Sequence, residues 1–79
     1  MAKVNFYAAA RAASGVSESA IEGSTLGEVI SSASAQYPKL VGILPGCSYL
    51  LNGAAESNNE MKINAEDVID ILPRFAGGA

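Results

Sequence analysis

The sequence predicts an α+β domain in which a mixed β-sheet of four to five strands is covered on one face by one main helix. Three observations predict it: an alternating segment opens the chain, a capped amphipathic segment lies at 25–37, and a run rich in β-branched residues lies at 68–72. A chain of 79 residues is long enough for one such domain. Residues 1–79 are therefore expected to form a single unit.

The start of the chain predicts a β-hairpin. Every second residue of segment 3–8 is apolar, which is typical of a half-buried strand. The chain is expected to turn near Ser14-Gly15 and to return as a second strand over residues 16–22. Gly23 then breaks the pattern.

A helix is predicted from residue 25. Thr25 followed three residues later by Glu28 forms a capping box, in which hydroxyl and carboxylate reciprocally bond the amides that a helix start leaves unpaired. Apolar residues at steps of three and four line one face, and they are Leu26, Val29, Ile30, Ala33 and Tyr37. Pro38 is expected to end the helix, and the apolar connector 40–46 is expected to pack against the domain.

The second half of the chain predicts the remaining strands. Residues 47–51 predict a third strand, and Asn52-Gly53 after it is the strongest short-range turn signal in the chain. Residues 54–62 predict an irregular edge with at most a short strand, and a last strand follows at 68–72. This order of elements is that of the β-grasp, the ubiquitin-like architecture.

Composition excludes several functions. The net charge is −3 and Lys and Arg form no cluster, so nucleic-acid binding is not expected. Histidine is absent and Cys47 is the only cysteine, so neither an intrachain disulfide nor a metal site is expected. Without histidine the usual general base is missing, and an enzyme acting alone is not expected.

A cytoplasmic location is expected. Arg11 interrupts the apolar start FYAAARAASG, so a signal peptide is not expected, and no stretch is long enough to cross a membrane. The single thiol of Cys47 suits a reducing cytosol. This thiol is expected to be packed and inert rather than to act as a sulfur relay.

Residues 73–79 are expected to form a flexible C-terminal tail. Pro73 lacks an N–H donor, so the sheet should stop before it. A Gly-Gly pair is by itself more often a frayed end. However, an extended chain from Pro73 to Gly78 reaches on the order of 20 Å, and glycines can pass a narrow channel. A main-chain carboxylate delivered in this way could be activated inside a partner without any side chain of this protein.

Four segments together resemble a known family. LPRFAGG resembles the tail of the MoaD/ThiS sulfur-carrier family, in which a hydrophobic strand runs into Leu-Pro, a short apolar bridge and Gly-Gly. FYAAARAASG, TLGEVISSASAQYP and CSYLLNG resemble the family's first strand and turn, its capped helix, and its third strand and turn. The segments span nearly the whole chain in the right order. The resemblance is closest to the MoaD branch, the small subunits of molybdopterin synthase, and implies the β-grasp fold.

The resemblance also implies partners and chemistry. A ubiquitin-activating-like adenylyltransferase, similar to MoeB, would use ATP and magnesium to adenylate the terminal glycine, and a sulfur-donating enzyme would lead to its thiocarboxylate. The tail would then insert into a MoaE-like large subunit and supply sulfur for molybdenum cofactor biosynthesis. The chain itself would bind no cofactor.

Carried onto this sequence, the resemblance makes Gly78 the activated glycine. The residues that would bind partners are Pro73, Arg74, Phe75, Ala76, Gly77 and Gly78. Ala79 departs from the family pattern, so the chain is expected to be inactive until a peptidase removes Ala79, unless that residue is artificial or the member is divergent. Ala65-Glu66-Asp67 also replaces an Asp-Gly-Asp-like turn, which should affect turn geometry more than function.

Alternatives remain open at this point. The sulfur could serve thiamine thiazole or cysteine synthesis, the chain could be a ubiquitin-like modifier of lysine, or it could be an interaction domain with an idle tail. Arg74 would either pair with an acidic groove of the adenylyltransferase or stay solvated. An apolar patch on the open sheet face is a candidate partner surface. Its candidate members, of which Phe6 is expected in the core instead, are Phe6, Tyr7, Tyr49, Leu51 and Phe75.

Overall fold

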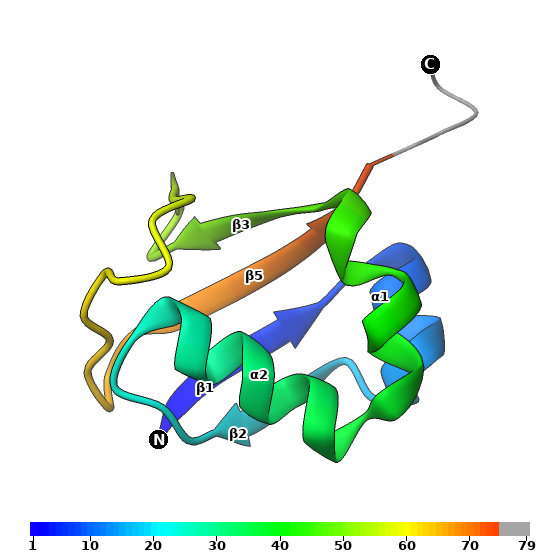
Figure 1. The fold of residues 1–79 in the computed structure, drawn as a ribbon, viewed down its shortest axis with the longest axis horizontal. Helices are drawn as coiled ribbons and strands as arrows, with labels where there is room; N and C mark the ends of the chain where they lie inside the picture. Colours follow the sequence, from blue (N-terminus) through cyan, green and yellow to red (C-terminus); the bar gives the residue numbers. More distant parts are fainter. Residues whose placement is uncertain (75–79) are drawn as a thin grey trace.

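The computed structural model describes residues 1–74 and shows one five-stranded sheet in the order β2-β1-β5-β3-β4 (Figure 1). The strands are β1 (Ala2–Phe6), β2 (Glu18–Ile21), β3 (Cys47–Leu51), β4 (Ala54–Ala55) and β5 (Val68–Pro73). β1 and β5 run parallel, and every other neighbouring pair is antiparallel. The mixed sheet and the predicted β-grasp fold are confirmed.

The core lies between the sheet and the helix α2 (Leu26–Gln36), which crosses one face of the sheet (Figure 1). The rings of Tyr37 and the buried Phe6 are nearly perpendicular, with a centroid distance of 5.6 Å, which is a favourable aromatic geometry. Alternate residues of the strands and one face of α2 are buried, as predicted. These core residues include Ala2, Val4, Phe6, Ile21, Ile69 and Ile71 from the sheet and Leu26, Val29 and Ala33 from α2.

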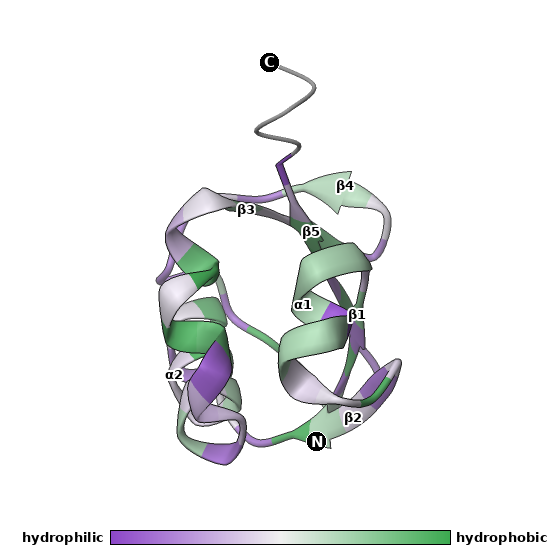
Figure 2. Ribbon diagram, turned by 90° about the vertical axis from the view of Figure 1, so that its right-hand side faces the viewer, coloured by the Kyte–Doolittle hydropathy of each residue, from purple (hydrophilic) through white to green (hydrophobic). Residues whose placement is uncertain are grey.

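The predicted hairpin contains a helix that the sequence analysis missed. β1 ends at Phe6, and α1 (Ala8–Ser14) takes the place of the expected turn; it faces the viewer in Figure 2, with α2 to its left. Five of its seven residues are alanine, the best helix former, whose small side chain fits an alternating pattern equally well. α1 ends at Gly15, whose φ of 81° is left-handed and whose N–H donates to Arg11 O. The antiparallel pairing of β1 with a shorter β2 is confirmed.

Ser24 and Thr25, the two residues before α2, both form hydrogen bonds with Glu28 in the first turn of the helix. Thr25 Oγ1 accepts the N–H of Glu28 at 3.2 Å, as the capping box predicts. The Glu28 carboxylate, however, does not return to the Thr25 amide: it accepts the N–H and the hydroxyl of Ser24, at 2.8 and 2.7 Å. These two bonds lower the pKa of Glu28, the backbone bond most. The reciprocal half of the predicted box is therefore wrong, because Ser24 offers two donors.

The segments after α2 follow the predictions closely. α2 ends before Pro38, and the 3-10 turns η1 (Pro38–Gly42) and η2 (Leu44–Gly46) pack through the fully buried Leu40. β3 has the predicted bounds, and Asn52 and Gly53 form the turn with φ of 50° and 87°. Within residues 1–74, no helix is long and apolar enough to cross a membrane.

Candidate functional site at the end of the last strand

β5 runs further than the sequence predicts. Pro73 belongs to the strand and pairs with Cys47 of β3, and the N–H of Arg74 donates to Gly46 O at 2.9 Å. The prediction that the sheet stops before Pro73, with a tail from that residue, is therefore wrong. The other predicted tail residues, 75–79, lie outside the described residues.

Proline is tolerated here because of the direction in which its nitrogen points. The backbone groups of β5 alternate between its two neighbours: Arg74 N–H faces β3, whereas Ile71 O faces β1 and accepts the N–H of Tyr7 at 3.3 Å. The Pro73 nitrogen therefore faces the β1 side, where β1 has already ended at Phe6. The missing donor removes no ladder bond, so the strand includes Pro73, and the next residue, Arg74, still donates its N–H to Gly46 O.

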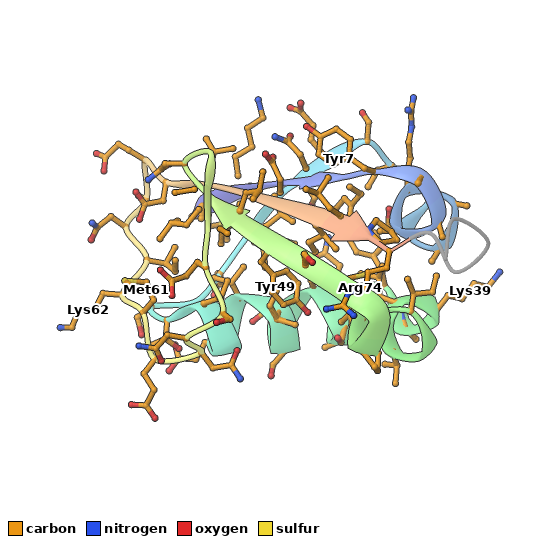
Figure 3. The ribbon with its side chains drawn as sticks, turned by 90° about the horizontal axis from the view of Figure 1, so that it is seen from above. Tyr7, Lys39, Tyr49, Met61, Lys62 and Arg74 are labelled. Atoms are coloured by element: carbon orange, nitrogen blue, oxygen red, sulfur yellow. The ribbon has the colours of Figure 1, made fainter. Side chains whose placement is uncertain are left out.

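A hollow of about 300 Å³ lies beside this strand end. Its lining includes Cys47 and Tyr49 of β3, Glu56 after β4, and Arg74. Figure 3 shows Tyr49 pointing from β3 toward α2 and Arg74 at the end of the strand. This volume is at the lower end for ligand sites, and the part of the chain that is described holds no cluster of acidic or thiol side chains for a metal ion. The hollow is large enough for a side chain of a partner protein.

The Cys47 thiol is packed, as predicted. It lies against the core, and Sγ donates to Ile43 O at 3.3 Å. Burial raises the pKa of Cys47, so the thiol stays protonated near neutral pH. Because the thiolate is the reactive form, this environment disfavours a sulfur relay at Cys47.

The residues of the predicted apolar patch are divided between the two sides of the sheet. Phe6 is buried, as expected, and Tyr49 and Leu51 also pack against the core, so the last two do not belong to an open-face surface. Tyr7 is 43% exposed and lies on the side of the sheet away from α2 (Figure 3). Phe75 is not among the described residues.

The open face carries residues that the sequence analysis did not single out. Leu50, Val68 and Leu72 are half-buried and alternate with residues that face the core, so they point away from α2. These three residues are neighbours of Asp70 on β5 and β3, and Tyr7 lies beside Leu72. We call these five residues the open-face patch. The alternation within β5 is a signal that could have identified three of them, because each residue next to a core residue must face the other side.

The sequence matches the model of the ThiS family over residues 4–78, a range that includes Gly77 and Gly78. The chain belongs to the ThiS family. ThiS and MoaD proteins are ubiquitin-like sulfur carriers, so the coarse assignment made from the four sequence segments is confirmed. Among curated proteins, none matches this sequence.

Solved structures share the fold of this ThiS-family chain. Small archaeal modifier protein 1 of Methanosarcina acetivorans has a TM-score of 0.88 and 26% identity, over 98% of this chain and 95% of that chain. CysO of Mycobacterium tuberculosis has a TM-score of 0.81 and 24% identity, over 95% and 100% of the two chains. A chain in the complex of subunits 1 and 2 of the molybdopterin-converting factor from Helicobacter pylori has a TM-score of 0.73 and 23% identity, over 98% and 97%.

Proposed function

We propose that this ThiS-family chain is a cytoplasmic sulfur carrier that acts as the small subunit of molybdopterin synthase. After loss of Ala79, Gly78 would be adenylated, converted to a thiocarboxylate and used as the sulfur donor in molybdenum cofactor biosynthesis. The observation that carries the proposal is the family match, which runs through Gly77 and Gly78, just beyond a strand end held at Arg74. The Helicobacter pylori neighbour, from a complex of two molybdopterin-converting subunits, supports the choice of pathway.

The register at the strand end limits the reach of Gly78. Because Arg74 still bonds Gly46, only residues 75–78 would enter a partner, and an extended chain of that length spans about 13 Å. This is shorter than the reach expected for a tail that begins at Pro73. A partner must therefore bring its reaction centre within that distance of the Gly46 end of β3.

The partner enzymes would supply the reagents. On a MoeB-like adenylyltransferase with ATP and magnesium, the Gly78 carboxylate would attack the α-phosphate and release pyrophosphate. Hydrosulfide supplied by the sulfur-donating enzyme would then attack the acyl adenylate, release AMP and leave a thiocarboxylate. In a MoaE-like large subunit, the thiocarboxylate would transfer its sulfur to the pterin precursor and return to the carboxylate by hydrolysis. Phe75, Ala76 and Gly77 would seat the tail inside the partner, and Pro73 and Arg74 would contact the partner at the strand end.

A second candidate function is modification of lysine. The Methanosarcina acetivorans neighbour is a small archaeal modifier protein and shares 26% identity with this chain. The same acyl adenylate would serve this function, but a lysine amine would attack it in place of sulfur, giving an isopeptide bond.

Intact mass spectrometry tests the sulfur-carrier proposal. A chain ending at Gly78 and the chain with Ala79 are each incubated with purified MoeB-like adenylyltransferase, ATP, magnesium and sulfide. We expect the chain ending at Gly78 to exchange one oxygen for one sulfur and the chain with Ala79 to keep its mass. If the chain ending at Gly78 never gains sulfur, the proposal fails.

The fate of the thiocarboxylated chain separates the pathways. When this chain is mixed with the MoaE-like large subunit and the pterin precursor, it should lose its sulfur while molybdopterin forms. A thiocarboxylated chain that keeps its sulfur in this mixture would instead favour delivery to thiamine thiazole or cysteine synthesis. Isopeptide adducts on lysine would favour the modifier function.

A further inference from the structure

The turn between β3 and β4 contains an asparagine that is followed by a glycine. The sequence has five asparagines, and Asn52 is the only one that precedes a glycine. The backbone nitrogen of the following residue can attack the Cγ of an asparagine side chain, and glycine hinders this attack least because it has no Cβ. The sequence therefore makes Asn52 the asparagine of this chain that is most susceptible to spontaneous deamidation.

Deamidation at this position needs no reagent other than water. The Gly53 nitrogen forms a bond to Asn52 Cγ while the Cγ–Nδ2 bond breaks, so that ammonia leaves with the proton of the Gly53 N–H and a five-membered succinimide remains. Water then opens this ring at one of its two carbonyl carbons. Opening at Cγ gives aspartate, and opening at the main-chain carbonyl carbon gives isoaspartate, in which the backbone runs through the former side chain.

The backbone of the folded turn keeps the two reacting atoms apart. Asn52 has a φ of 50°, in the left-handed region, where ψ is also positive, at about 30–60°. With such a ψ, the Gly53 nitrogen lies on the opposite side of the Cα–C bond from Cβ, whereas the succinimide ring requires both on the same side. The left-handed pair Asn52 and Gly53 is also what a two-residue turn between antiparallel strands requires. Ring closure therefore requires the turn to open.

Both polar atoms of the Asn52 side chain are held by residues at the start of β5. The N–H of Val68 donates to Asn52 Oδ1 at 2.9 Å, and Asn52 Nδ2 donates to Asp67 Oδ1 at 3.0 Å. The backbone N–H of Asn52 adds a third bond, to Val68 O at 2.8 Å. Ring closure makes the planar Cγ tetrahedral and expels Nδ2, so it cannot proceed while the side-chain bonds persist. The contacts that fasten β5 to the turn therefore also protect the amide.

The deamidated side chain does not fit this contact. An aspartate at position 52 can still accept the N–H of Val68, but it has no donor for Asp67, so two carboxylates meet where a hydrogen bond of 3.0 Å lay. Asp67 is itself held in place, because its Oδ2 accepts the N–H of Asn64 at 2.7 Å. Isoaspartate instead adds a main-chain atom to a two-residue turn whose length sets the register of the two strands.

We propose that Asn52 is a site of spontaneous deamidation that is protected in the folded domain and is converted only in chains whose β3–β4 turn has opened. The reaction takes up water, releases ammonia and leaves aspartate or isoaspartate at position 52. Each event is irreversible, so a chain that has opened and refolds carries the changed residue. Such a chain holds the start of β5, the central strand of the sheet, less firmly than the original chain does.

Mass spectrometry of folded and unfolded chains tests the protection. The full chain is incubated in mildly alkaline buffer, with and without enough urea to unfold it, and peptide mapping follows each asparagine. We expect Asn52 to be converted first in urea, and to be converted about tenfold or more slowly in the folded chain, because only opened turns react. Equal rates with and without urea, or faster conversion of another asparagine in the unfolded chain, would overturn the proposal.

Asp67→Ala tests whether the contacts of the turn provide the protection. This variant removes the acceptor of Asn52 Nδ2, so conversion in the folded state should rise by about 2- to 10-fold beyond the increase in its unfolded fraction, which urea unfolding measures. Thr25→Ala is the matched control, because it weakens the start of α2 and leaves the bonds of Asn52 intact. Its conversion should rise no more than its unfolded fraction does. If Asp67→Ala behaves in the same way as this control, global folding alone protects Asn52, and the role given to the turn is overturned.

Asn52→Asp reproduces one product and tests its effect on the fold. We expect this variant to unfold at a lower urea concentration than the wild type. Adding Asp67→Asn should recover most of the loss, because the new amide can donate to the aspartate at position 52 while its oxygen still accepts the N–H of Asn64. If Asn52→Asp is as stable as the wild type, or if Asp67→Asn recovers nothing, the two carboxylates do not oppose each other and this consequence of deamidation is refuted.

Discussion

Gly23 joins β2 to α2 in a conformation that a residue with a β-carbon rarely adopts, since its φ is 151°. An alanine Cβ at this position would lie 2.6 Å from Val29 N and 2.9 Å from Val29 Cα. Both atoms belong to the backbone of α2, so no side-chain rotation can relieve the overlap. We therefore expect Gly23→Ala to shift the start of α2 and to destabilise the fold.

Two terms set the size of this effect. A residue held in a backbone region open almost only to glycine costs about 1–3 kcal/mol. Overpacking against a fixed neighbour costs about a further 1–3 kcal/mol, so the free energy of unfolding should fall by about 2–6 kcal/mol. A domain of this length has a total stability on the order of 4–12 kcal/mol, so Gly23→Ala should remove a large part of it.

Urea unfolding followed by circular dichroism measures the loss. Gly42→Ala is the matched control, because Gly42 has no positive φ and an added Cβ would meet nothing within 4 Å. This control should stay within about 0.5 kcal/mol of the wild type or gain slightly in stability. Equal free energies of unfolding for the two variants would refute the argument that the contact with Val29 and the positive φ require glycine at position 23.

Two further predictions concern polar groups at turns. Thr25→Ala removes the bond from Glu28 N–H to Oγ1 and should lower the free energy of unfolding, measured in urea, by about 0.5–2 kcal/mol. Thr25→Ser keeps a hydroxyl and should retain most of the wild-type stability. Equal stability of the two variants would contradict the capping role. The pKa of Asp67 is lowered by the N–H of Asn64 and then by the Asn52 amide, and the pKa of Glu28 is lowered as described above. A folded-state pKa below the unfolded one contributes stability that is present above the unfolded pKa and is lost as the pH falls through the folded pKa. The melting temperature should therefore decline on acidification, and less steeply in Asp67→Asn and Glu28→Gln; equal slopes in all three proteins would contradict this assignment.

The sheet and α2 could be predicted because large side chains and caps leave a clear pattern. Val4 and Phe6 alternate with other residues along β1, and both are buried. Thr25 and Pro38 mark the two ends of α2 because one satisfies free amides and the other cannot continue a helix. In these segments the local chemistry and the tertiary packing favour the same structure.

The missed features depend on information that a local pattern does not contain. The alanines of α1 satisfy a strand or a helix equally, so the alternation from Val4 to Ala8 continued past the real end of β1. The effect of Pro73 depends on which neighbour its nitrogen faces and on where that neighbour ends, and both follow from the parallel register of β1 with β5. Asp70 could have been placed on the open face from its neighbours Ile69 and Ile71, but its pairing with Asn5 is a contact 65 residues apart in sequence.

The held strand end sets the geometry of the chemistry proposed for Gly78. The N–H of Arg74 donates to Gly46 O at 2.9 Å, so the chain that could enter a partner begins after Arg74. Four residues of extended chain, 75–78, span about 13 Å. A partner that receives Gly78 must therefore place its reaction centre within about 13 Å of Arg74, and a partner with a deeper reaction centre would bind the domain without reaching the glycine.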